Sequence, residues 1–332
     1  MKPFPFLPAA RGSLVWLTML LAMPLAADYD THVDADAFVA KMVEEHAFAA
    51  EDVRSLLAAA ERQQSILDAI ARPAEKTKPW YEYREIFLND RREREGIEFL
   101  RRHRATLARA QARTGVPAEI IVAILGVETY YGRVAGSYRV LDALSTLAFD
   151  YPPRSSFFTG ELENFLLLTR EQGLNPVELK GSYAGAMGYG QFMPSSYRAY
   201  AVDFDEDGVA DIWNNPEDAI GSVANYLARH GWRAGEPIVS AATLRGDPEP
   251  GIFDGKLKPR RSVGQLAAAG VVAEQPLDPE APATAMRFEV RDGHEHWVGL
   301  HNLYVITRYN HSAMYAMSVY QLSQRLAEGA AS

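Results

Sequence analysis

The chain has 332 residues, of which 48% are hydrophobic, and this length and composition allow a sizeable buried core. They exclude a chain that is disordered throughout, and 24 glycines with 19 prolines are too few for a collagen-like or low-complexity protein. A formal net charge of −9 gives no basic footprint for phosphates, so we expect no nucleic-acid partner. The lack of cysteine excludes disulfides, thiolate zinc sites, cysteine nucleophiles and lipids attached through cysteine.

The first 27 residues have the layout of a secretory signal peptide. Basic Lys2 and Arg11 precede an apolar stretch over 14–25, and two alanines stand before Asp28. The stretch is shorter than the roughly 20 apolar residues that span a bilayer, which favours cleavage over a retained membrane anchor. We therefore expect residues 1–27 to be removed and the mature protein to be exported, soluble and free of a membrane anchor.

The following part of the chain has a helical pattern. Apolar residues recur at spacings of three and four over 38–46, 51–71 and 91–114. The mixed charges of 91–104 favour a solvated helix face over a binding patch. Pro117 suits the start of a nearly all-apolar helix, AEIIVAILGVETYYG, which must be buried on most sides.

The second half changes character twice. Residues 181–213 are rich in small and aromatic residues and are too irregular for one long element. Pro216 then opens another helix, with Gly231 as its stop. Alternating apolar and polar residues over 236–308, including HEHWVGL and NLYVITRY, predict a small β-rich lobe, and Ser312 caps a last helix. The expected fold class is α+β, mainly α.

The segment DFDEDGVAD at 203–211 has the pattern of an EF-hand-like loop. Carboxylates at alternate positions, with glycine at the sixth, wrap oxygens around a hard cation such as calcium. Asn214 stands at position 12, where a bidentate Glu is usual, so Glu217 or Asp218 on the following helix would close the cage. The alternative is an acidic turn without metal. The predicted loop ligands are Asp203, Asp205, Asp207 and the carbonyl of Val209.

Glu128 is the only acid of the apolar helix beyond its first turn. Its neighbours Leu125, Val127 and Tyr131 would strip water from the carboxylate, so we expect a raised pKa and a proton donor near neutral pH. The alternative is a helix-end Glu that points to water. The residues alone do not decide between the two.

Five segments, in this order and spacing, resemble the MltB-type membrane-bound lytic murein transglycosylases: GVETYYGRV, LDALSTLAFDYPPRSSFF, GELENFLLL, GAMGYGQFMPSSY and DAIGSVANYLARHGW. The resemblance runs from about Asp34 through TRYNHSAMYAM, and it implies a lysozyme-like helical core with a calcium loop. The implied parts are a signal peptide (1–27), an N-terminal helical domain (28–115), a lysozyme-like catalytic core with the EF-hand-like loop (116–235), a small β-rich lobe (236–308) and a C-terminal helix packing back on the helical part (309–332).

The resemblance also implies roles for single residues. Glu128 matches the single catalytic acid of the family, and Asp218 matches the carboxylate that closes the metal loop. Arg154 matches a basic residue after YP, although the family often has two arginines there and this chain has Pro153 in the first place, which puts one contact in doubt. The implied substrate-binding residues are Ser182, Gln191, Tyr226, Tyr309, Tyr315, Arg154 and Tyr83.

The implied activity is cleavage of the β-1,4 bond between N-acetylmuramic acid and N-acetylglucosamine in peptidoglycan, which leaves 1,6-anhydromuramic acid ends. Glycosidases that use water carry two carboxylates, whereas the resemblance offers Glu128 alone as acid and then base. A hydrolytic muramidase of the goose-lysozyme kind and a non-catalytic wall-binding scaffold are the alternatives.

The resemblance further implies the setting in which the protein works. We expect a periplasmic protein with a structural calcium ion and no organic cofactor. Peptidoglycan glycan strands are the expected partner, and wall-synthesis enzymes are candidate protein partners.

Overall fold

The structure is a computed structural model that describes residues 29–71 and 78–331, so the predicted signal peptide lies outside the described residues. The helices are α1 (Ala35–His46), α2 (Ala50–Ala59), α3 (Gln64–Ile70), α4 (Trp80–Phe87), α5 (Asp90–Arg102), α6 (Arg104–Thr114), α7 (Ala118–Thr129), α8 (Val140–Asp150), α9 (Ser155–Glu171), α10 (Pro194–Tyr200), α11 (Pro216–Arg229), α12 (Val263–Ala268), α13 (His301–Tyr309) and α14 (Ala313–Ala331). The strands are β1 (Tyr138–Arg139), β2 (Lys180–Gly181), β3 (Val239–Leu244), β4 (Arg261–Ser262), β5 (Val271–Ala273), β6 (Pro282–Val290) and β7 (Gly293–Gly299). The expected class, mainly α with a small β part, is confirmed.

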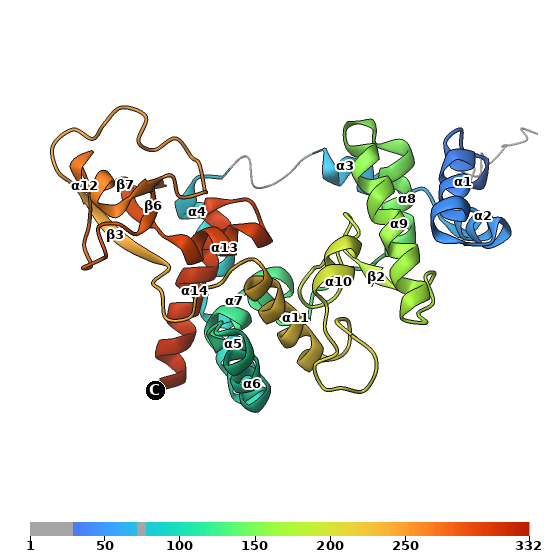
Figure 1. The fold of residues 1–332 in the computed structure, drawn as a ribbon, viewed down its shortest axis with the longest axis horizontal. Coiled ribbons are helices and arrows are strands. Elements are labelled where there is room, and N and C mark those ends of the chain that lie inside the picture. The colour runs from blue at the N-terminus through green and yellow to red at the C-terminus, as the bar shows by residue number, and fades with distance from the viewer. Residues whose placement is uncertain (1–28, 72–77, 332) are drawn as a thin grey trace, which may run out of the picture.

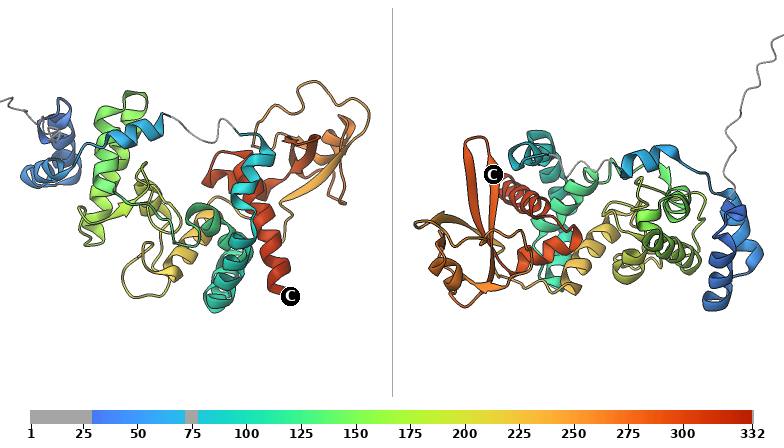
Figure 2. Two further views of the ribbon diagram at one scale, coloured as in Figure 1. Left: turned by 180° about the vertical axis from the view of Figure 1, so that it is seen from behind. Right: turned by 90° about the horizontal axis from the view of Figure 1, so that it is seen from above.

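The elements are arranged in a row along the long axis of the molecule, but not in chain order (Figure 1). Helices α1 and α2 lie at one end, next to α8 and α9, and the five-stranded sheet lies at the other end. Between them stand α10, α11 and the group formed by α5, α6, α7 and α14, and the view from above keeps this order (Figure 2). The C-terminal helix α14 therefore lies in the middle of the molecule, against α7, α5 and α4.

Helix α7 is the centre of the main core. Every residue from Ile120 to Val127 is buried, as the apolar sequence AEIIVAILGVET predicts. Helices α14, α5, α11 and α6 pack around it. Its C-terminal end is therefore held on several sides, which fixes the position of Glu128.

The small sheet has the strand order β4-β6-β7-β3-β5, and all of its pairings are antiparallel. Strand β6 pairs with β7 in a register that sets Met286 opposite Trp297. A second hydrophobic cluster, with Leu266 of α12 and Val298 of β7 among its members, fills one side of the sheet. The predicted strands around 286–290 and HEHWVGL are confirmed.

Three expected elements differ in the structure. NLYVITRY, expected to be a strand, forms α13, in which Leu303 and Ile306 are buried three positions apart and the buried Asn302 bonds the carbonyls of Arg233 and Glu236. A short apolar run is compatible with the period of a strand and with that of a helix, and here tertiary contacts favour the helix.

The expected helix over 51–71 is broken into α2 and α3. The break is held from outside, because Asp142 accepts the backbone N–H of Glu61 and Thr146 accepts that of Gln63. These bonds to α8 replace the intrahelical bonds that a continuous helix would make. The helical pattern over 91–114 is likewise interrupted, at His103, between α5 and α6.

No single helix in residues 29–71 and 78–331 is long and apolar enough to cross a membrane. Helices α6 and α7 reach that length and apolar character only when taken together, and they are bent by 112°.

Helix α4 joins the helical part to the sheet. Trp80 donates its indole N–H to Glu295 Oε1 of β7 at 2.6 Å, and its ring lies 5.1 Å from that of Phe288. Glu295 also lies 3.7 Å from the guanidinium of Arg84. Because Trp80 is buried, its N–H has no water to replace a lost acceptor.

We expect Glu295→Ala to lower the free energy of unfolding by about 1–3 kcal/mol, since the buried indole N–H loses its acceptor. The matched control is Glu236→Ala, which removes only an exposed pair with Arg233 at 3.4 Å and should cost less than about 1 kcal/mol. Urea unfolding of both variants measures the difference. Equal losses would show that α4 is not held by this contact.

Candidate active site

Glu128 is the penultimate residue of α7 and is half-buried. The helix ends sharply after it, because Tyr130, Tyr131 and Gly132 all adopt positive φ. Thr129 fastens this end by donating its hydroxyl to the carbonyl of Tyr189 at 2.7 Å and accepting the N–H of Gly132 at 2.9 Å. The carboxyl group therefore stands at a rigid helix end that is tied to the loop around residue 189.

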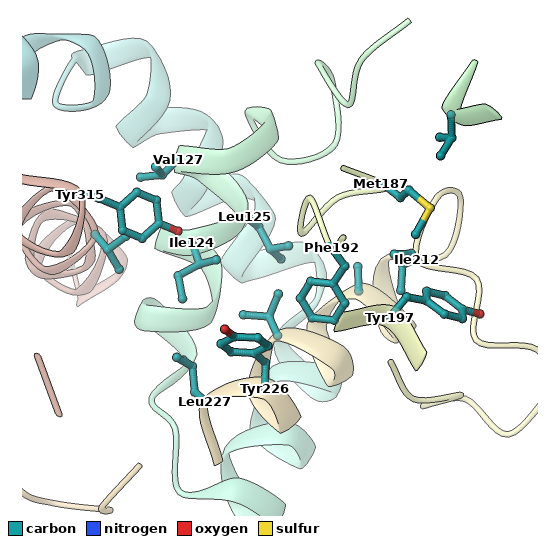
Figure 3. Packing of buried hydrophobic residues seen from close by; sticks show 14 of the residues in the cluster. Ile124, Leu125, Val127, Met187, Phe192, Tyr197, Ile212, Tyr226, Leu227 and Tyr315 are labelled. Carbon is teal, nitrogen blue, oxygen red and sulfur yellow. The ribbon is translucent and has the colours of Figure 1, made fainter. Parts of the chain in front are cut away.

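Tyr315 of α14 contacts Glu128 directly. Its hydroxyl donates to Glu128 Oε1 at 2.6 Å, and the tyrosine is only 2% exposed. Figure 3 shows the Tyr315 ring beside Ile124 and Val127 of α7. Burial raises the pKa of Tyr315 well above its usual range, and the charge of Glu128 raises it further. The hydroxyl therefore keeps its proton and acts as a fixed donor to the carboxyl group.

Two more tyrosines line the same region. The Tyr309 hydroxyl donates to the carbonyl of Gly190, and the Tyr226 hydroxyl donates to that of Arg308, each at 2.5 Å. Their rings lie 4.7 Å apart. Burial raises the pKa of Tyr226 to about 12, and that of Tyr309 rises well above its usual range through burial and then the charge of Glu128.

These contacts bear on the expected sugar-binding tyrosines. Tyr226 and Tyr315 are buried, and the hydroxyls of Tyr226, Tyr309 and Tyr315 all bond to protein acceptors. Tyr226 and Tyr315 thus form walls of the site and are not exposed stacking platforms. Tyr83 of α4 is also buried, and its phenol group adds to the rise in the pKa of Tyr315, so it belongs to the same neighbourhood.

The irregular segment 181–192 forms a tightly folded loop beside these residues. The Ser182 hydroxyl oxygen accepts the N–H groups of Ala184 and Ala186, at 3.3 and 3.0 Å, so its own proton remains available for donation. Gly188 has φ +67, and a Cβ there would lie 2.4 Å from the carbonyl oxygen of Ile212, so only glycine fits.

Gln191 completes this loop. It adopts an uncommon φ of +51 and donates its amide nitrogen to the carbonyls of Ala135 and Gly188 at 3.1 and 3.0 Å. Both amide protons are thereby used, which leaves the side-chain oxygen as the group that can accept a hydrogen bond from a ligand.

Among the described residues, the guanidinium of Arg154 contacts the rings of Phe157 and Phe158. It stands before α9, and its guanidinium lies 4.3 Å from the ring centre of Phe157, a residue that is 43% exposed. The pair offers a cation and an apolar face on the surface. Its predicted contact with substrate stays a prediction.

Arg92 is a buried residue of the site that its place in the sequence does not reveal. It lies in the charge run that was expected to be a solvated face, yet it is buried on α5. Its Nε donates to the carbonyl of Gly126 at 3.0 Å, its Nη1 donates to the carbonyl of Ile86, and its guanidinium lies over the Tyr130 ring. Burial lowers its pKa. The spacing of residues in a run of mixed charges does not distinguish one buried arginine from its exposed neighbours.

The EF-hand-like segment folds into a turn whose carboxylates converge. One oxygen from each of Asp203, Asp205 and Asp218 lies within 4.8 Å of the other two. Asp203 accepts the backbone N–H groups of Asp207 and Gly208, which gives the loop its shape. Asp207 instead accepts the N–H of Val209.

Asp218 closes this cluster from the first turn of α11. It is fully buried and accepts the N–H groups of Phe204 and Asp211, at 2.7 and 2.8 Å. Burial raises its pKa, and the charges of Asp205 and Asp203 raise it further. Glu217, the other possible ligand, pairs with Arg109. Converging hard oxygen donors with mutual repulsion fit a divalent cation such as calcium.

Comparison with known proteins identifies the class. The family model described as the transglycosylase SLT domain matches residues 30–324, so the chain belongs to this family. It is therefore an enzyme of the lytic transglycosylase class.

The chain is 46% identical to membrane-bound lytic murein transglycosylase B of Escherichia coli, over 92% of this chain and 86% of that protein. It is also similar to the solved structure of the catenated lytic transglycosylase SltB1 of Pseudomonas aeruginosa, with 54% identity, a TM-score of 0.88, and coverage of 91% of this chain and 100% of that one. The expected resemblance is confirmed.

Other solved relatives carry ligands. The Escherichia coli lytic transglycosylase Slt35 in complex with calcium is 44% identical, covering 92% of this chain and 96% of that one, with a TM-score of 0.84. SltB3 of Pseudomonas aeruginosa in complex with NAG-NAM-pentapeptide is 32% identical, covering 89% of this chain and 79% of that one, with a TM-score of 0.77.

Proposed function

We propose that this lytic transglycosylase cleaves the β-1,4 bond between N-acetylmuramic acid and N-acetylglucosamine in peptidoglycan, with Glu128 as its single acid and base. The observation that carries the proposal is the Glu128 carboxyl group at the end of the buried helix α7, held by Tyr315 at 2.6 Å. Among the described residues, Glu128 is the one carboxylate that acts on the pKa values of both Tyr309 and Tyr315.

The reaction begins with proton transfer from Glu128 to the glycosidic oxygen. The departing sugar leaves an oxocarbenium-like centre at C1, which the neighbouring acetamido group of the substrate stabilises. Glu128, now ionised, accepts the proton of the C6 hydroxyl, whose oxygen attacks C1 and closes the 1,6-anhydro ring. The proton that Glu128 gives up is thereby restored, and no water is consumed.

The surrounding residues support this sequence of steps. The Ser182 hydroxyl offers a donor and the Gln191 side-chain oxygen offers an acceptor to the sugar, while Arg154 is a candidate contact for an anionic group of the stem peptide. Tyr226, Tyr309 and Tyr83 shape the walls. The relative SltB3 was solved with NAG-NAM-pentapeptide and with NAG-anhNAM-pentapeptide, which favours the same substrate class here.

A hydrolytic muramidase is the competing reaction on the same fold. A second carboxylate, roughly 5–9.5 Å from the first, would serve that reaction as nucleophile or as the base that activates water. The relatives favour the transglycosylase, since the similar proteins of Escherichia coli and Pseudomonas aeruginosa are lytic transglycosylases. A non-catalytic scaffold has no use for a carboxyl group held at a helix end by a buried tyrosine.

We also propose a structural calcium ion at the loop that joins α10 to α11. Asp203, Asp205 and Asp218 would hold it, with Asp207 and the carbonyl of Val209 as further ligands. The ion would neutralise converging carboxylates and so stabilise the native loop. The Slt35 relative was solved in complex with calcium.

For the cellular setting we propose a periplasmic protein, freed from its signal peptide, that acts on glycan strands. The relative in Escherichia coli is a membrane-bound murein transglycosylase, whereas this chain has no cysteine for lipid attachment. Wall-synthesis enzymes as protein partners rest on the family resemblance alone. N-terminal sequencing of the soluble periplasmic fraction should find a start near Asp28, and an intact Met1 on membranes would contradict it.

The experiment for the proposed activity is digestion of purified sacculi, with the terminal sugars identified by mass. Muropeptides with 1,6-anhydro ends, each lighter by one water than a lysozyme product, support the transglycosylase. Reducing ends would identify the hydrolytic alternative instead.

A further inference from the structure

We propose that Tyr315 is a positioning residue that orients Glu128 and sets the pH range of the enzyme, and not a platform for sugar. The inference rests on the proposed role of Glu128. It assigns Tyr315 a different role from the aromatic sugar contact that the family resemblance implies.

Tyr315 lies within hydrogen-bond distance of Glu128 and is held in a fixed position. The Tyr315 hydroxyl lies 2.6 Å from Glu128 Oε1, and the residue is 2% exposed, so its ring offers no face to a ligand. Its backbone is fixed as well, because α14 begins at Ala313 and the Tyr315 N–H bonds the Ser312 hydroxyl at 3.3 Å. The donor therefore reaches the carboxyl group from a rigid, packed helix that runs along α7.

The hydrogen bond from Tyr315 affects the balance between the ionised and the protonated form of Glu128. A hydroxyl that donates to a carboxyl oxygen stabilises the ionised form over the protonated form. Burial at the end of α7 acts in the opposite direction and favours the protonated acid. Tyr315 thus offsets burial, so that Glu128 can both give up a proton to the glycosidic oxygen and persist as the carboxylate that accepts one from the C6 hydroxyl.

The other groups around this end of α7 are uncharged or already paired. Tyr309 and Tyr226 donate to backbone carbonyls, and Arg92 donates to the carbonyls of Gly126 and Ile86. On α5, Glu95 pairs with both Arg91 and Arg133, and on α6, Arg109 pairs with Glu217. Titratable and charged groups on the elements packed here include Tyr315 (α14), Tyr309 and Arg308 (α13), Tyr226 (α11), Tyr83 (α4), Arg91, Arg92, Glu93 and Glu95 (α5), and Arg109 (α6), with Tyr130 and Tyr131 directly after α7.

Loss of the Tyr315 hydroxyl should shift the pH profile of the enzyme to higher pH. Tyr315→Phe keeps the ring but removes the donor, so the pKa of Glu128 rises and the protonated acid survives to higher pH. The alkaline limb of the kcat/KM profile, which reports the free enzyme, should move up by about one to two pH units. The turnover number should also fall about 10- to 100-fold, because the carboxyl group loses its orientation.

The matched control is Tyr29→Phe. Tyr29 is 1% exposed and donates to a carboxylate, Asp150 Oδ2, at the same 2.6 Å, but it lies against Phe149 and Asp150 of α8. Both variants lose one buried hydroxyl bond to a carboxylate, so both should lose similar stability. Only Tyr315→Phe should move the alkaline limb.

A second substitution tests the sign without removing the bond. Site-specific incorporation of a difluorinated tyrosine at position 315 strengthens the donor and should move the alkaline limb to lower pH, opposite to Tyr315→Phe. The profiles are measured with soluble glycan strands as substrate. Opposite shifts from the two changes, with none in Tyr29→Phe, support the proposal.

An unmoved limb in both position-315 variants, whatever their thermal stability, would overturn it and leave Tyr315 a packing residue. That result is distinct from failure of the proposed function. The function fails only if Glu128→Gln remains active, or if the wild-type products carry reducing ends.

Discussion

Replacing Glu128 with glutamine should lower turnover by at least about 10²- to 10⁴-fold, the usual contribution of general acid–base catalysis. Glutamine keeps the size of the side chain and can still accept the Tyr315 hydroxyl, so α7 and its packing stay intact. It cannot release a proton to the glycosidic oxygen or recover one from the C6 hydroxyl. Because both steps use the same group, the loss should appear in kcat more than in KM.

The control for this substitution lies on the same helix. Glu119→Gln changes an acid in the first turn of α7, at the end opposite Glu128, and should leave turnover close to that of the wild type. Circular dichroism and the melting temperature verify that both variants fold. Substantial activity in Glu128→Gln would place the acid on another residue.

Calcium should raise the melting temperature of the wild-type protein, and the Asp203→Asn, Asp205→Asn double variant should lose that response. An ion that binds only the native state adds about 2.7 kcal/mol at a concentration 100 times its dissociation constant. For a chain of 332 residues, that corresponds to a rise in melting temperature of roughly 4 °C. Differential scanning calorimetry in calcium and in chelator measures it.

The control is Glu206→Gln. Glu206 lies in the same loop but pairs with Arg113 at 3.6 Å, outside the cluster of converging carboxylates. Its variant should keep the full response to calcium. Identical melting of the wild type with calcium and with chelator would remove the metal site and leave the assignment of Glu128 untouched.

Much of the architecture follows from patterns in the sequence. The apolar run at 120–127 predicts a buried helix, and α7 is buried along that whole stretch. The alternation at Met286 and Phe288 predicts a strand, which is β6. Where the local pattern allowed two structures, contacts with distant residues determine which one forms. Asp142 and Thr146 bond the backbone before Gln64 and so interrupt the helix there. Asn302 of α13 bonds the backbone of Arg233 in the helical form.

The site was harder to predict in detail. The position of Glu128 in an apolar helix points to a special carboxyl group, but its hydroxyl partner stands 187 residues further along the chain. No spacing rule connects α7 to Tyr315 or to the buried Arg92, because only the packing of α14 and α5 brings them there. The alternating acids of the loop, in contrast, are local. The position of the next helix left Glu217 and Asp218 both open, and only the family resemblance pointed to Asp218, whose carboxylate converges with those of Asp203 and Asp205.

The most direct test of the account is digestion of sacculi by the wild-type protein in ¹⁸O-labelled water. Capture of C1 by the C6 hydroxyl uses no solvent oxygen, so the new muramic acid ends should be 1,6-anhydro sugars that carry no ¹⁸O. Attack by water would place one ¹⁸O atom on each new reducing end. Label in the new ends would contradict the intramolecular reaction at Glu128 and identify the enzyme as a hydrolase.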